Sequence, residues 1–115
     1  MTMTMQDVID LTRFYLNDQD SASEIWEDTE LVMLGNIGVN RVTDIRKDAL
    51  YDAAGDLITV VPAVDGTSTL SIDGKWKEVV ATATAMEALK KQAGQTFNDL
   101  KVAALTAQFA TLIKV

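Results

Sequence analysis

The chain has 115 residues, 48% of them hydrophobic and 23% charged, and it contains neither cysteine nor histidine. This length suits one domain, spanning 1–115, with a core that needs no disulfide. The two missing residue types exclude disulfides, thiolate nucleophiles, Cys-ligated zinc and any histidine that activates a serine or cysteine. We therefore expect a structural or binding protein rather than an enzyme, and no cofactor.

The formal net charge of −7 is unevenly distributed along the chain. Residues 1–56 hold twelve acids and four bases, whereas residues 57–115 hold five acids and six bases. So acidic a chain is poorly suited to neutralise phosphates, which argues against a reader of duplex DNA. The densest acidic run has six members: Asp18, Asp20, Glu24, Glu27, Asp28 and Glu30. Charge runs usually face solvent, and a repulsive or partner-facing surface is the alternative.

The predicted fold is mainly α. It is a small four-helix domain with a short β-hairpin or extended arm inserted between the second and third helices. In the first helix, Thr4 is the expected N-cap, with Asp7 in the first turn and Asn17–Asp18 at the end. The three methionines that alternate at the start of the chain, Met1, Met3 and Met5, are interpreted as a frayed terminus.

Asp28 or Thr29 is the expected cap of the second predicted helix, which runs to about Ala49–Asp52. Trp26 precedes it and is interpreted as a buried aromatic residue. The segment Gly35-Asn36-Ile37-Gly38 lies inside the helical pattern and lacks the strand and lysine of a phosphate-binding loop. We therefore interpret its glycines as sites of close helix packing.

The centre of the sequence changes from helical to extended periodicity. Leu57–Val61 is rich in β-branched residues and is followed by Pro62, and Thr69–Ile72 alternates as a short strand does. Asp65–Gly66 is a turn signal between these two stretches. A two-stranded hairpin is only marginally stable, so this segment must pack on the helices or on another chain.

The last third of the sequence predicts two alanine-rich helices. Asp73 is the expected cap of the third helix, which Gly94 ends, and Thr96 or Asn98 begins the fourth. The short connection predicts that these two helices are antiparallel neighbours. No run approaches the roughly 18 apolar residues of a membrane-spanning helix, and no secretory signal is visible, so we expect a soluble protein without a membrane partner.

The order of these elements resembles that of the phage head–tail adaptor (connector, head-completion) proteins. The resemblance rests on DVIDLTRFYLND at 7–18, on Trp26 with acids before ELVMLGNIGVNRV, and on the central Asn36. It continues through LITVVPAV, TLSIDGKWKEVV and the final helix NDLKVAALTAQFATLIKV, and so covers nearly the whole chain. The family has no catalytic residues that would offer a signature.

The resemblance implies a homo-oligomeric ring, commonly of twelve copies, beneath the portal protein. Such a ring extends the DNA channel, lets DNA pass without specific binding, and docks the next neck or tail component. The location implied is the head–tail neck of the virion, after assembly in the host cytoplasm.

Three sets of residues are predicted to serve this role. The acidic run named above is expected to face the lumen, where it repels DNA so that DNA slides. The predicted inter-subunit arm consists of Leu57, Ile58, Val60, Val61, Leu70 and Ile72. The predicted portal-docking end consists of Leu112, Ile113, Lys114 and Val115, and it is short for an inserting tail.

Two alternatives remain open from the sequence. One is a soluble helical protein–protein interaction module that is not part of a virion. The other is a different phage neck or tail-completion protein. An enzyme of Asp, Glu, Lys or Ser chemistry is a weaker alternative, because no residue spacing suggests it.

Overall fold

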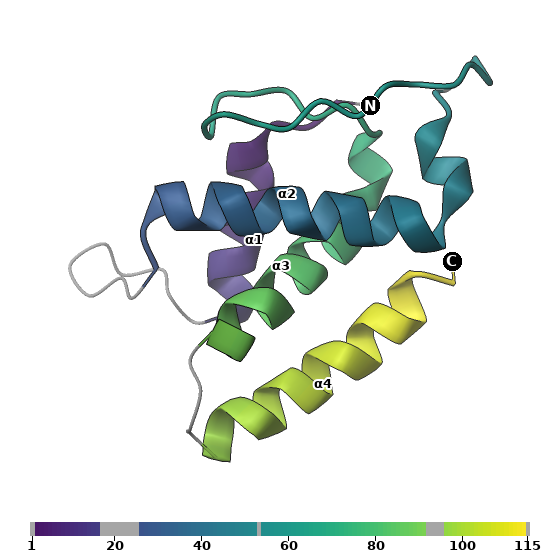
Figure 1. Ribbon diagram of the computed structural model, residues 1–115. Helices are drawn as coiled ribbons and strands as arrows, with labels where there is room; N and C mark the ends of the chain where they lie inside the picture. The colour runs from purple at the N-terminus through teal and green to yellow at the C-terminus, as the bar shows by residue number, and fades with distance from the viewer. Residues whose placement is uncertain (1, 17–25, 53, 92–95, 115) are drawn as a thin grey trace.

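The computed structural model describes residues 2–16, 26–52, 54–91 and 96–114, and these contain four α-helices and two short 3-10 helices. The elements are α1 (Met5–Leu16), α2 (Asp28–Ile45), η1 (Lys47–Leu50), η2 (Gly74–Trp76), α3 (Lys77–Lys91) and α4 (Thr96–Leu112). α2 crosses over α1 and α3, and α4 lies beyond α3 and runs back along it (Figure 1). The predicted mainly α fold with four helices is confirmed.

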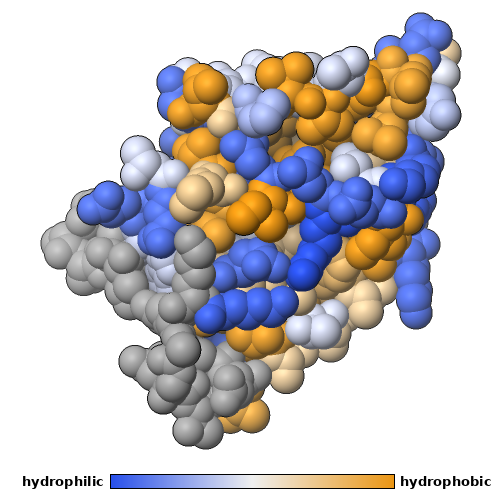
Figure 2. All heavy atoms as spheres, viewed as in Figure 1, coloured by the Kyte–Doolittle hydropathy of each residue, from blue (hydrophilic) through white to orange (hydrophobic). Residues whose placement is uncertain are grey.

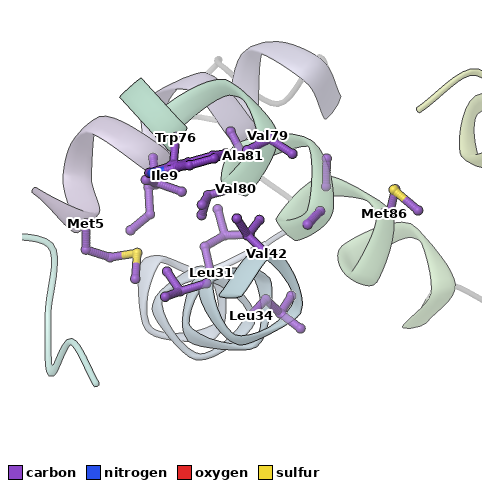
Figure 3. Packing of buried hydrophobic residues seen from close by; sticks show 14 of the residues in the cluster. Met5, Ile9, Leu31, Leu34, Val42, Trp76, Val79, Val80, Ala81 and Met86 are labelled. Atoms are coloured by element: carbon purple, nitrogen blue, oxygen red, sulfur yellow. The ribbon is translucent and has the colours of Figure 1, made fainter. Parts of the chain in front are cut away.

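The centre of the packing is α3, which contacts each of the other three helices. Ala81, Ala83, Ala85 and Ala88 are all fully buried, as expected for a helix with neighbours on several sides. Small side chains let these neighbours approach closely, while larger residues such as Leu31, Val42 and Val80 fill the space between α2 and α3 (Figure 3). The buried hydroxyls of Thr82 and Thr84 are satisfied by carbonyl oxygens one turn earlier in the same helix.

Two glycines set how closely α2 approaches its neighbours. A Cβ atom at Gly38 would lie 2.7 Å from Thr84 Oγ1 and 3.0 Å from the carbonyl oxygen of Val80. A Cβ atom at Gly35 would lie 2.6 Å from the Sδ atom of Met5. The interpretation of this glycine segment as close helix packing is confirmed.

Local capping residues explain where two of the helices begin. The backbone N–H of Thr4 donates to Asp7 Oδ2 at 2.9 Å, and the N–H of Asp7 donates to Thr4 Oγ1 at 3.3 Å. Asp73 Oδ1 accepts from the backbone N–H of Lys75 at 2.9 Å and starts η2, which leads directly into α3. Both predicted caps are confirmed.

The predicted limits of the second helix were wrong at both ends. The N-cap residue is Glu27, whose side chain makes no capping hydrogen bond. α2 ends at Ile45 because Arg46 is extended, with φ −110° and ψ 92°, and the chain resumes as η1. After this break, Ala49 is fully buried in η1.

The start of the chain also differs from the prediction of a frayed terminus. Met3 is 3% exposed and Met5 is fully buried, so both belong to the core. Met1 lies outside the described residues. The alternation Met3, Thr4, Met5 puts two apolar side chains inward because residues 2–4 are extended before α1 begins.

The segment between η1 and η2 does not form the β-hairpin that was one of its two predicted forms, and it is described below as the arm. In the described part of the chain, the bridges outside helices are two isolated antiparallel ones, Thr4 with Thr69 and Tyr51 with Leu57. Residues 57–61 and 69–72 therefore do not form a ladder with each other. Pro62 has no N–H to contribute, and several backbone groups of the arm bond to the N-terminus and to α2 instead.

Candidate interaction surfaces

The side chain of Asn36 on α2 binds the inner side of the arm (residues 57–73). Its Nδ2 donates to the carbonyl oxygen of Ala63 at 2.9 Å, and its Oδ1 accepts from the N–H of Ala63 at 2.9 Å. One amide thus satisfies both backbone groups of a buried residue, as a neighbouring strand would. The central asparagine on which the family resemblance partly rests therefore has a definite structural role here.

The returning half of the arm is held by the N-terminal segment. The N–H of Met5 donates to the carbonyl oxygen of Ser68, and the N–H of Leu70 donates to that of Met3, each at 2.9 Å. Leu70 and Ile72 are 6% and 1% exposed and belong to the core of their own chain. These two predicted inter-subunit residues are therefore already covered, which the sequence pattern did not reveal.

The outgoing half of the arm has an inner and an outer side, as an extended chain does. Ile58 and Val60 are half-buried against the core, whereas Leu57 and Val61 are 68% and 63% exposed. Val64 is 84% exposed and was not among the predicted residues, although it belongs to the same apolar run before the Asp65–Gly66 turn. Apolar side chains gather along this edge of the molecule (Figure 2).

The acidic run is only partly within the described residues. Asp18, Asp20 and Glu24 lie outside them, while Glu27 and Asp28 are exposed at the start of α2 and Glu30 is half-buried. The predicted role of these acids in a lumen stays a prediction. Sequence reasoning missed a base beside the run: Nη2 of Arg13 on α1 pairs with Asp28 Oδ1 at 2.5 Å. The Arg13 side chain is 7% exposed, so this pair ties α1 to the start of α2.

The C-terminal end of α4 is clasped by Arg46. Nη1 of Arg46 donates to the carbonyl oxygen of Ile113 at 2.6 Å, while its Nε and Nη2 bind the two carboxylate oxygens of Asp48 at 2.9 and 2.7 Å. The guanidinium also lies 5.1 Å from the ring centroid of Trp76. The hydrogen bond from Arg46 holds the pKa of Asp48 below its usual range.

This clasp changes what the predicted portal-docking residues offer to a partner. Leu112 is half-buried and Ile113 is 8% exposed, so both pack on their own chain. Lys114 is exposed, and Val115 lies outside the described residues. An open hollow of about 350 Å³ lies beside the clasp; its lining includes Lys75 and Glu78. Its charged groups Arg46 and Asp48 are already paired with each other.

A polar junction joins α1, α3 and α4 in the interior. Gln108 Nε2 donates to Thr82 Oγ1 at 2.8 Å, and both side chains also interact with the hydroxyl of Tyr15. Burial raises the pKa of Tyr15, and the nearby charge of Glu78 raises it further. The phenol therefore stays protonated at neutral pH and serves packing.

No group of three or more acidic side chains within residues 2–16, 26–52, 54–91 and 96–114 is arranged to hold a metal ion. Within the same residues, no helix combines the length and apolarity needed to cross a membrane.

Comparisons with family models, with curated proteins and with solved structures find no match to this chain. The fold itself defines a class, a small helical domain with an extended arm between α2 and α3.

Proposed function

We propose that this chain is a structural protein of a phage virion, a head–tail adaptor that forms a ring beneath the portal protein. The ring extends the DNA channel and docks the next neck or tail component on its other face. Each copy is located in the neck of the virion after assembly in the host cytoplasm. Twelve copies is the number implied by the family resemblance.

The observation that carries this proposal is the arm. Its inner side is fixed by Asn36 and by the N-terminal segment, yet its outer side leaves Leu57, Val61 and Val64 in water. A folded arm that exposes large apolar side chains together is typical of a surface that another protein covers. The resemblance in element order and the helical fold with an arm between α2 and α3 support the same conclusion.

The net charge of −7 supports the same role. Many copies in a ring make a strongly negative assembly, and a negative channel wall repels DNA so that it slides without sticking. We expect some of the acids at 7–30 to line the lumen. Electron microscopy of the ring with these acids on its outer wall would contradict that part of the proposal.

The experiment that tests the function measures the mass of the purified full chain by native mass spectrometry and counts particles by electron microscopy. Both measurements are made on the chain alone and on the chain mixed with the portal protein of the same phage. The proposal expects a closed ring of one stoichiometry that caps the portal. A stable monomer or dimer that ignores the portal contradicts it and favours the alternative of a helical interaction module.

A further inference from the structure

The outer face of α4 is unusual for a surface helix because it carries no charge over three turns. Residues 102–113 contain no Asp, Glu, Lys or Arg. Leu105, Phe109 and Ile113 are buried in the core, with α3 as the main helical neighbour. Leu100, just before this stretch, is 72% exposed, and the opposite side exposes small, uncharged side chains: Ala103, Ala104, Thr106, Ala107, Ala110 and Thr111. The outer side of a surface helix normally carries charged residues.

The arm supplies a second uncharged surface of different shape. Residues 57–64 contain no charged side chain, and they present Leu57, Val61 and Val64 outward. The arm projects side chains, whereas the alanine face of α4 is shallow and lets a neighbouring backbone approach closely. The two surfaces are therefore complementary in shape, and both are uncharged.

The two surfaces lie on opposite sides of the molecule. Figure 1 shows the arm along one edge, above α2, and α4 along the other edge, beyond α3. A ring requires a heterologous contact, in which one face of each copy meets a different face of the next. Because each copy carries a net charge of −7, copies repel one another, and this repulsion is weakest where uncharged surfaces meet.

From this placement we infer that the occupant of the α4 face is a second copy of this chain. The outer side of the arm of one copy packs on the outer face of α4 of the next. The inference rests on the proposed ring and names the contact that closes it. It also explains why α4 stays uncharged over residues 102–113 on the side that its own chain leaves open.

The sequence contains no cysteine, which permits a direct test, because the introduced thiols are then the only thiols in the chain. Val64→Cys is combined in turn with Ala103→Cys, Ala107→Cys and Ala110→Cys, and the assembled full chain is oxidised with copper phenanthroline. All of these positions are exposed, so the unfolding midpoint is expected to stay unchanged. At least one pair should give a ladder of covalent multimers on a denaturing gel, while each single variant stays a monomer.

Control pairs and single variants separate the outcomes. Val64→Cys with Asn40→Cys, which is exposed on α2, should give no ladder. Disulfide-linked dimers from Ala107→Cys alone would mean that α4 pairs with α4, which overturns the inference. Rings of normal mass in which none of the three pairs reacts also overturn it but leave the proposed function standing. A chain that stays monomeric with the portal contradicts both.

Discussion

The arm and α4 both pack onto the group of helices α1, α2 and α3, but they are held in different ways. The arm has no ladder of its own, so its inner side depends on hydrogen bonds to Asn36, Met3 and Met5. α4 satisfies its own backbone and is held by apolar side chains against α3, with two polar links at Gln108 and Ile113. The difference teaches that backbone hydrogen bonds set the path of the arm, in addition to the burial of Leu70 and Ile72, whereas apolar burial positions α4. Each of the two leaves an outer side exposed.

The largest expected effect comes from the apolar attachment of α4. Phe109→Ala removes a buried ring and should lower the free energy of unfolding by about 3 kcal/mol. Urea unfolding followed by circular dichroism measures this. Because α4 packs chiefly on α3, its amides should also exchange faster than those of α3.

A matched control is Thr111→Ala on the exposed side of the same helix, which should change stability by less than about 0.5 kcal/mol. Equal effects from the two variants would mean that α4 is not held by apolar burial, and the comparison with the arm would fail.

The polar attachment of the arm is tested by Asn36→Ala. This change leaves the N–H and the carbonyl oxygen of buried Ala63 without their partner and should cost about 2 kcal/mol. Hydrogen exchange should show that the Ala63 amide loses protection, while the amides of α3 keep theirs. Asn40→Ala, at an exposed position one turn later on α2, is the control and should have little effect.

Protection at Ala63 that is unchanged in Asn36→Ala would show that the arm is held by other contacts. Asn36→Asp sharpens the result, because it keeps the acceptor for the Ala63 N–H but loses the donor to its carbonyl oxygen. We expect its stability to lie between those of the wild type and Asn36→Ala.

Among the three substitutions that remove a contact, the smallest expected change in stability is at Asp73, where the arm leads into η2 and α3. Asp73→Ala removes the cap on the Lys75 N–H and should cost about 1 kcal/mol at pH 7. That hydrogen bond lowers the pKa of Asp73 below its ordinary value of 3.8. The stabilisation is therefore complete above the unfolded-state pKa and is lost as the pH falls through the lowered folded-state value.

Thermal unfolding tests the direction of this pH dependence. It is measured for wild type, Asp73→Ala and Asp73→Asn at pH 7 and at a series of lower pH values. Asparagine keeps the cap, so Asp73→Asn should lose less than Asp73→Ala at pH 7, and its stability should depend less on acid. A gap between wild type and Asp73→Ala that widens in acid would contradict the assignment.

The sequence predicted what depends on near neighbours. The Thr4–Asp7 cap, the Asp73 cap and the four helices follow from residues a few positions apart. Of the two predicted forms, β-hairpin or extended arm, the hairpin was wrong because the arm takes its partners from Asn36, 27 positions before Ala63, and from the N-terminus. Periodicity cannot tell which of several distant groups will accept a strand-like segment.

The predicted surfaces show the same difference between features set by near neighbours and features set by distant partners. Alternation in 57–61 correctly gives an inner and an outer side to the arm, but it does not reveal that Leu70 and Ile72 are buried by their own chain. Met3 and Met5 were interpreted as frayed because nothing near them in sequence indicates that Met3 bonds to the arm and that Met5 packs against α2. The pair of Arg13 with Asp28, 15 positions apart, is equally invisible to local patterns.

The central claim is that the free outer side of the arm joins copies of this chain into a ring. Its most direct test is the mass, with the portal protein, of Val64→Asp, which puts a charge on a side chain that is 84% exposed. Thr29→Asp adds the same charge at an exposed site on α2 and is the control. We predict that Val64→Asp folds with unchanged stability but stays monomeric, while wild type and Thr29→Asp form rings. Rings of normal mass from Val64→Asp would contradict the account.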